Sequence, residues 1–316
     1  MSNTEAAPDQ LACRASRFTG VLHPREVPLG GPRAIRVRRT LPQREPLIGA
    51  WCFIDHYGPH DVRAGTGMDV PPHPHTGLQT VSWLFSGEIE HRDSAGVHAT
   101  VRPGELNLMT AGAGICHSEV ASPSAPILHG VQLWVALPDA DRDTERDFIH
   151  FAPTVQTLGA ARLRVFIGEL GGVRSPVHTF TPLLGAQIDL APGAAIQLTV
   201  DHAFEHGVHL DRGEVVAGGT ALGVADLWYQ SPGHDTVALT NTGERPARVL
   251  LLGGLPFAEE LIMWWNFVGR SHEEMVRYRR QWQEGDERFG SVSDYPGARL
   301  PAPPLPNSTL LPRPNP

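Results

Sequence analysis

The sequence predicts an all-β fold, and two observations carry that prediction. The 316 residues include 33 glycines and 29 prolines, and both residue types interrupt helices and favour turns. Between the turns lie short runs that alternate apolar and polar residues, which is the period of a strand with one buried face. Apolar residues make up 41% of the chain, enough to build a sizeable core.

The candidate strands fall into two blocks. The first block, residues 13–140, contains runs such as QTVSWLFSG and ELNLMTAG. A charged segment, DADRDTERDF at 139–148, interrupts the pattern, and a second series of strands begins near residue 150. Glycine-containing turns at short intervals in both blocks indicate sandwiches or barrels. We therefore predict two tandem β domains, at 13–140 and 150–290.

The two ends of the chain differ from these blocks. Residues 1–12 are polar and acidic, so we expect a disordered segment without the features of a signal peptide. Residues 296–316 are rich in proline and should form an extended tail. Before this tail, SHEEMVRYRRQWQEG at 271–285 predicts an amphipathic helix, with Ser271 and Glu274 at capping-box spacing.

Composition excludes several classes of function. A formal net charge of -8 offers no global basic surface for nucleic acid. The chain has no lysine, which excludes Schiff-base chemistry and a phosphate-binding P-loop. Its three cysteines form no CxxC pair, and so sparse a set suits a reducing compartment. No apolar run reaches the ~18–20 residues that span a bilayer. We expect a cytoplasmic protein, monomeric, with no membrane or nucleic-acid partner.

Two short motifs carry the chemistry. His73 and His75 are two residues apart in PPHPHTGLQT, and His117 and Glu119 repeat this spacing in GICHSEV. Residues i and i+2 of a strand point to the same face. Two such strands lying side by side would bring three imidazoles and one carboxylate to one point. We therefore predict a site for one divalent transition metal at His73, His75, His117 and Glu119.

The other histidines and the cysteines are weaker candidates for a functional site. His56 and His60 are candidates for the rim of the metal site, and a lone histidine is more often structural. In the second block, His202, His206 and His209 lack the HxH…HxE arrangement, so we expect that domain to be free of metal. Cys116 precedes His117, and the alternation of a strand should turn its thiol into packing. The chain contains no HExxH, GxSxG or GxGxxG motif for other common chemistries.

The spacing of these motifs resembles the two-motif signature of the cupin superfamily, whose small β barrels hold a metal inside. Two departures stand out, because Gln79 occupies the place of the usual cupin glutamate and four residues separate Gly112 from His117. Both departures, together with HPHTGLQTVSWLFSGEIEHRDSAG and PGELNLMTAGAGICHSE in that order, identify the chain as a member of the pirin family over about residues 35–290. Pirins are bicupins, so the resemblance implies two tandem cupin barrels with the helix at the C-terminal end.

The same resemblance implies a ligand set and an activity. By motif, the ligands are His73, His75, His117 and Glu119, and Fe(II) is the expected ion, with manganese, nickel, copper, cobalt and zinc as alternatives. Some pirins open flavonols such as quercetin with O2, so we expect an oxidoreductase of the quercetin 2,3-dioxygenase type with Glu119 as the catalytic base. Thr76, Gln79 and the run Glu260-Leu261-Ile262, which stands in place of a usual EPI, depart from the common pirin sequence, and this affects the pocket and the substrate.

Two alternatives stay open at this stage. Pirins also resemble regulators whose metal tunes the binding of a protein partner, such as a transcription factor or a metabolic enzyme. A third interpretation is a bicupin whose metal serves only its structure. Fold alone does not separate these functions.

Overall fold

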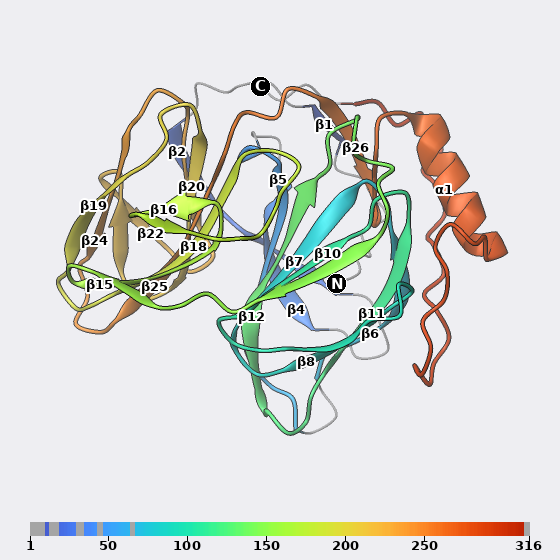
Figure 1. The fold of residues 1–316 in the computed structure, drawn as a ribbon, viewed down its shortest axis with the longest axis horizontal. Helices are drawn as coiled ribbons and strands as arrows, with labels where there is room; N and C mark the ends of the chain where they lie inside the picture. Colours follow the sequence, from blue (N-terminus) through green and yellow to red (C-terminus); the bar gives the residue numbers. More distant parts are fainter. Residues whose placement is uncertain (1–9, 13–18, 30–34, 43–46, 64–66, 313–316) are drawn as a thin grey trace.

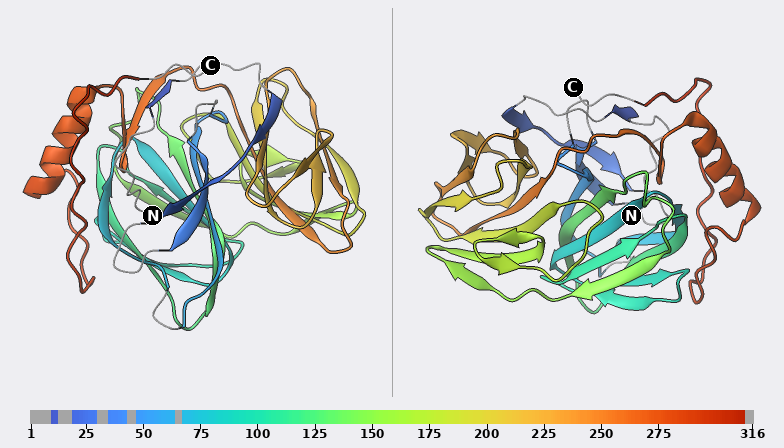
Figure 2. Two further views of the ribbon diagram at one scale, coloured as in Figure 1. Left: turned by 180° about the vertical axis from the view of Figure 1, so that it is seen from behind. Right: turned by 45° about the horizontal axis from the view of Figure 1, so that its top comes forward.

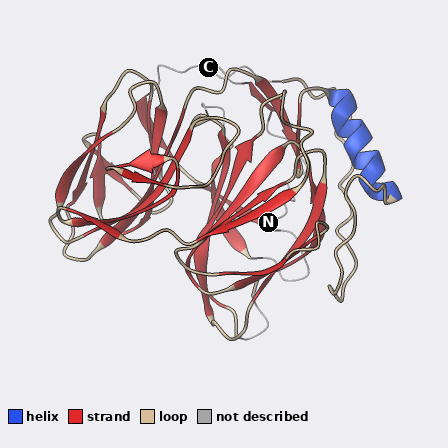
Figure 3. Cartoon of the chain, in the orientation of Figure 1, coloured by secondary structure: helices blue, strands red, loops and turns tan. Residues whose placement is uncertain are grey.

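The computed structural model describes residues 10–12, 19–29, 35–42, 47–63 and 67–312. Strands dominate these ranges, and two β barrels lie side by side with one helix at the outer edge of the first (Figures 1 and 3). The all-β prediction is confirmed, and the second barrel and the helix follow as expected. Within the described ranges, no helix is long and apolar enough to cross a membrane.

The first barrel consists of two antiparallel sheets. Its seven-stranded sheet has the order β13 (Asp147–Phe151), β10 (Leu106–Thr110), β7 (Leu78–Ser86), β12 (Ile127–Ala136), β5 (Trp51–Asp61), β4 (Arg36–Leu41) and β3 (Arg25–Pro28). Its four-stranded sheet has the order β6 (Asp69–His75), β11 (Ile115–Ala121), β8 (Ile89–Asp93) and β9 (His98–Val101).

The second barrel repeats this plan. Its larger sheet has the order β14 (Gln156–Leu158), β15 (Ala161–Ile167), β18 (Leu183–Leu190), β25 (Ala247–Gly254), β20 (Glu205–Arg212), β23 (Leu227–Gln230) and β2 (Thr19–Leu22). The smaller sheet has the order β19 (Ala195–Thr199), β24 (Thr236–Asn241), β21 (Val215–Ala217) and β22 (Thr220–Leu222). A short hairpin, β16 (Glu169–Leu170) and β17 (Val173–Arg174), stands beside them.

Strand β7 is in contact with both barrels. Seven of its nine residues are buried, because one face lines the first barrel and the other packs on the second. Ser82 turns inward, and the next residue, Trp83, turns outward to contact Phe166 and donate a 2.9 Å hydrogen bond to Gln187 Oε1. A strand buried on both faces loses the simple apolar–polar alternation.

The chain exchanges segments between the two barrels (Figure 2). Strand β2 precedes the first barrel in sequence but pairs with β23 of the second. In the other direction, β26 (Glu260–Trp264) and β27 (Phe267–Gly269) return to the first barrel, where Phe267 bridges to Thr76. Strand β13 also belongs to the first barrel, although it lies beyond residue 140. The observed packing therefore differs from the linear division at 13–140 and 150–290.

The predicted N-terminal segment needs a similar revision. Residues 10–12, which we expected to be disordered, form β1 (Gln10–Ala12) against β26, while residues 1–9 lie outside the described residues. The proline-rich tail has no regular secondary structure up to residue 312, and residues 313–316 again lie outside the described part.

Helix α1 (His272–Glu284) confirms the predicted helix. Ser271 and Glu274 form the reciprocal capping box, and Gly285 ends the helix with a left-handed φ of 77°. The buried face packs Met275, Tyr278 and Trp282 against the first barrel.

The tail continues this cover over the first barrel. Leu300 N–H donates to Pro72 O at 2.9 Å, directly before the HPH motif, and Leu300 O accepts from the Trp282 indole at 2.8 Å. Cys116 lies beneath in the same apolar cluster and is 2% exposed, and burial raises the pKa of its thiol to about 12. The thiol thus turns into packing, as expected, in a cluster to which Ala302 and Leu310 of the tail contribute.

The two barrels meet at a close contact around Gly49. Gly49 N–H donates a 2.7 Å hydrogen bond to Glu205 Oε2, and Glu205 Oε1 accepts from the Tyr229 hydroxyl at 2.9 Å. A Cβ at Gly49 would lie 2.6 Å from Gly254 Cα, and its φ is +53°, so only glycine fits there. Burial raises the pKa of Glu205 to about 7. The carboxyl between the barrels thus titrates near neutral pH.

Removing residues 296–316 should expose Cys116. We expect its alkylation by a maleimide to accelerate by at least about tenfold, because a thiol reacts when it can reach solvent and ionise. Mass spectrometry of each cysteine peptide measures this directly. Cys52, fully buried in the barrel core, is the internal control and should stay protected. Unchanged labelling of Cys116 would show that the tail does not cover it in solution.

Glu205 should make stability depend on pH. The folded protein keeps this carboxyl protonated up to about pH 7, whereas the ordinary pKa is 4.5. Folding therefore takes up a proton in that window, and the free energy of unfolding falls as pH rises through it. Relative to Glu205→Gln, the free energy of unfolding of the wild type should fall by roughly 3 kcal/mol as the pH rises from the ordinary pKa to the raised one. Urea titrations of both proteins at several pH values test this, and parallel pH profiles would contradict it.

Candidate metal centre

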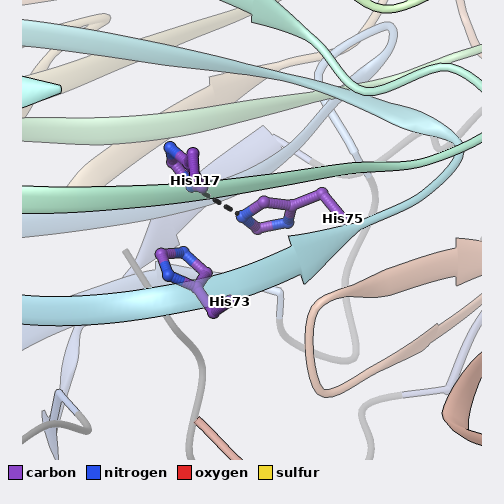
Figure 4. Close-up of side chains that lie close together, drawn as sticks. All are labelled: His73, His75 and His117. Atoms are coloured by element: carbon purple, nitrogen blue, oxygen red, sulfur yellow. Dashed lines mark hydrogen bonds between the residues drawn. The ribbon is translucent and has the colours of Figure 1, made fainter. Parts of the chain in front are cut away.

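Strands β6 and β11 place the predicted ligands next to each other. The strands pair antiparallel, with His117 opposite His73 and Ile115 opposite His75. The three imidazoles project from these neighbouring strands toward one point, as Figure 4 shows. His75 Nε2 lies 3.1 Å from His117 Nε2, and one ring nitrogen from each histidine lies within 4.8 Å of the others. The structure thus brings together the three histidines that the sequence singled out.

Hydrogen bonds to the backbone fix the tautomers of two of these rings. His73 Nδ1 lies 2.9 Å from Pro71 O, and His75 Nδ1 lies 3.1 Å from Asn266 O. A carbonyl oxygen only accepts, so Nδ1 carries the hydrogen in both rings. Each Nε2 therefore presents a lone pair toward the centre. Asn266 lies in the turn between β26 and β27, so the C-terminal segment of the chain orients a ligand on β6.

His117 is oriented by side chains instead. Its Nδ1 lies 3.4 Å from His91 Nδ1, and His91 Nε2 lies 3.0 Å from Asp93 Oδ2. Because Asp93 accepts from His91 Nε2–H, His91 Nδ1 is left as an acceptor for His117 Nδ1–H. The relay Asp93–His91–His117 thus turns the His117 Nε2 lone pair to the centre. Sequence analysis missed His91 and Asp93, although the HRD run on β8 repeats the same i, i+2 spacing.

Burial keeps the three imidazoles neutral. His73, His75 and His117 are all 0% exposed. Burial lowers the pKa of each ring well below 6.5, and His73 and His75 lower that of His117 further. Neutral imidazole is the form that ligates a metal.

Glu119 lies two residues beyond His117 on β11, and the register of β11 with β6 shifts between the two. It is fully buried, and the Ser82 hydroxyl lies 3.3 Å from its Oε1. Its carboxylate forms a compact group with His91 and His117, whereas His73 and His75 group with His117. His117 is therefore the residue common to both groups.

The donor atoms fit a first-row divalent ion. Two lone pairs that face each other at 3.1 Å repel unless a cation lies between them, and His73 Nε2 is buried without a hydrogen-bond partner in the described part of the chain. Two adjacent ligands on a six-coordinate ion with bonds of about 2.1 Å are about 3 Å apart. Three imidazoles with one carboxylate suit iron, manganese, nickel, copper, cobalt or zinc.

The other predicted residues lie away from this centre or change its surroundings. His56 lies at the contact between the barrels, and His60 bonds to Arg36 O near the surface, so neither forms its rim. Gln79, at the place of the usual cupin glutamate, is tied to the Thr110 hydroxyl at 2.9 Å. In the second barrel, His206 and His209 are buried on β20, and His202 is exposed.

The chain is similar to known proteins over most of its length. Residues 34–135 match the family model described as Pirin, and residues 185–290 match the Pirin C-terminal cupin domain. A Pseudomonas aeruginosa protein with the provisional name of a quercetin 2,3-dioxygenase is 43% identical over 97% of this chain and 98% of its own. A pirin-like protein of Caulobacter vibrioides is 35% identical over 79% of this chain and 88% of its own. The crystal structure of a quercetin 2,3-dioxygenase from Acinetobacter baumannii superimposes with a TM-score of 0.87, at 38% identity, covering 93% of this chain and 98% of that one.

Replacing His91 by phenylalanine should weaken metal binding without removing a ligand. The variant keeps the ring volume but leaves His117 Nδ1 without its acceptor, so we expect roughly a 10- to 100-fold loss of affinity. Competition with a chromophoric chelator measures the affinity. His98→Phe, which removes an exposed histidine of the neighbouring strand β9, is the matched control. Equal affinities for His91→Phe and the wild type would refute the relay.

Proposed function

The chain belongs to the pirin family, and we propose on this premise that it is a metal-dependent dioxygenase that opens flavonols such as quercetin with O2. The observation that carries the proposal is the convergence of three imidazole lone pairs inside the first β barrel, with a buried carboxylate beside them. The similarity to quercetin 2,3-dioxygenases over nearly the whole chain supports the same reading.

His73, His75, His117 and Glu119 would hold the metal, with Fe(II) as the proposed ion. When bound, it supplies a Lewis acid for the 3-hydroxyl oxygen of the flavonol and a site that accepts O2. The relay from Asp93 would keep the His117 ring oriented during turnover, and the carbonyl of Asn266 would do the same for His75. Neither Asp93 nor Asn266 belongs to the proposed ligand set.

Glu119 is the proposed base for the flavonol 3-hydroxyl. Ser82 stands between Glu119 Oε1, at 3.3 Å, and Gln132 Oε1, at 2.9 Å. Its one hydroxyl hydrogen serves only one of these acceptors at a time. When Glu119 takes a proton from the substrate, the Ser82 hydroxyl can turn to Gln132, so the carboxyl changes charge without leaving an unpaired donor.

The inner wall around Glu119 offers further polar atoms to a polyhydroxylated substrate. Ser82 is paired in register with Asn107 on one side and Gln132 on the other, so all three share a face. Gln132 Nε2, Asn107 Nδ2 and the Tyr57 hydroxyl are buried without hydrogen-bond partners within the described residues. Unpaired polar atoms in a buried wall favour a ligand or water that pairs with them. Trp134, whose ring lies 5.2 Å from His75, adds an apolar surface against which an aromatic ring can pack.

Iron-loaded protein should consume quercetin under air. We expect the flavonol absorbance to fall with time and His117→Ala to abolish the reaction, because it removes a ligand common to both donor groups. Glu119→Gln keeps an oxygen donor but not a base, and should slow the reaction by about 10²- to 10⁴-fold.

Metal analysis of each protein is the control, since a slow variant that has lost its ion says nothing about the base. Wild-type protein that holds iron yet turns over no faster than His117→Ala would refute the oxygenase proposal. In that case the regulatory alternative predicts protein partners that differ between the ferrous and ferric forms. A purely structural ion predicts a lower melting temperature on metal removal and no such difference.

A further inference from the structure

A second group of potential ligands lies between the two barrels. His56 on β5 and His129 on β12 belong to the first barrel, and Asp211 on β20 belongs to the second. One donor atom from each lies within 4.8 Å of the others. His56 and Asp211 are 1% and 2% exposed. This group shares no residue with the centre around His117.

The distances resemble a coordination polyhedron. His56 Nε2 and His129 Nε2 are 3.4 Å apart, and they lie 2.9 and 2.7 Å from Asp211 Oδ1. Two nitrogen ligands on a tetrahedral ion with bonds of about 2.05 Å are about 3.3 Å apart. The two rings therefore already have the separation that zinc requires, and the carboxylate would need to withdraw by about 0.5 Å.

Several buried polar atoms here have no hydrogen bond in the described part of the chain. These are His56 Nδ1, Asp211 Oδ2 and both ring nitrogens of His209, whose ring centroid lies 5.6 Å from that of His56. Arg248 Nη1 is 3.5 Å from Asp211 Oδ2, and its guanidinium also pairs with Asp189. A simple pair of histidine–aspartate hydrogen bonds would leave the fully buried His209 ring unsatisfied, which is costly.

A pocket borders the cluster on the side of His56. It has a volume of about 220 Å³ and is lined by His56 together with Arg38, Glu26 and His60. Burial lowers the pKa of His56, so its ring is neutral at pH 7. Burial alone would raise the pKa of Asp211, but hydrogen bonds from His129 and His56 hold this pKa below its usual range. The carboxylate is therefore charged.

We propose that His56, His129 and Asp211 bind a second divalent transition-metal ion and that this ion links the two barrels. Zinc fits the three ligands best. Two imidazoles and one carboxylate suit zinc. The fourth ligand is a water, to which the His209 ring offers an acceptor. Because the ligands come from both barrels, the binding free energy of the ion adds to the stability of their contact.

The stoichiometry of zinc binding tests the proposal. After chelation and dialysis against zinc, the wild type should retain about two ions per chain and His129→Gln about one. Glutamine keeps a donor for Asp211 but lacks the imidazole, and His129 is the most exposed of the three ligands, so the variant should fold. His98→Gln is the matched control, because His98 also pairs with a carboxylate, Glu90, outside the cluster. It should bind as many ions as the wild type. Equal zinc content in His129→Gln and wild type would overturn the proposal.

A second measurement does not depend on the folding of His129→Gln. In His117→Ala, which leaves the contact between the barrels intact, added zinc should still raise the melting temperature, and bound cobalt should give the intense visible bands of a four-coordinate ion. Absence of both effects in folded His117→Ala protein would overturn the second site. This result is independent of quercetin turnover, so failure of the oxygenase proposal and failure of the second site can be told apart.

Discussion

Three neutral imidazoles with their lone pairs facing one another inside the first barrel are the constraint on which the rest of the structure depends. Lone pairs at 3.1 Å repel, and buried nitrogens without partners are costly. The arrangement persists only if a hydrogen bond at Nδ1 fixes the orientation of each ring. The partners are the carbonyls of Pro71 and Asn266 and, for His117, the relay from Asp93 through His91. Each comes from a different segment of the chain, so the centre is a tertiary property and not a local one.

The exchange of segments between the barrels follows from the same need. Asn266 reaches the ligand on β6 only because β26 and β27 leave the second barrel and lie on the first. The helix and the tail then extend this cover as far as Pro72, next to the ligand strand. The second barrel therefore contributes to the centre of the first through the segments that connect the two.

The contact between the barrels is itself polar. Glu205 receives a backbone N–H from one barrel and a hydroxyl from the other, and His56 and His129 meet Asp211 near the other end of β20. Buried polar groups at an interface specify one relative placement, because any other placement leaves them unpaired. Protonation of Glu205 and a bound cation at Asp211 are two ways of satisfying the same requirement.

The sequence by itself determined the all-β class, the capped helix at 271–285 and the pairing of His73 and His75 with His117, because strand alternation and capping are local rules. The same spacing rule also singled out Glu119, which the resemblance to the pirin family implied as the fourth ligand. Tertiary structure alone decided that β2 and residues 260–312 cross between the barrels, and that His91 orients His117. It also decided that His56 faces a carboxylate some 150 residues away. No local rule reaches these contacts, because they depend on which faces meet once the barrels pack.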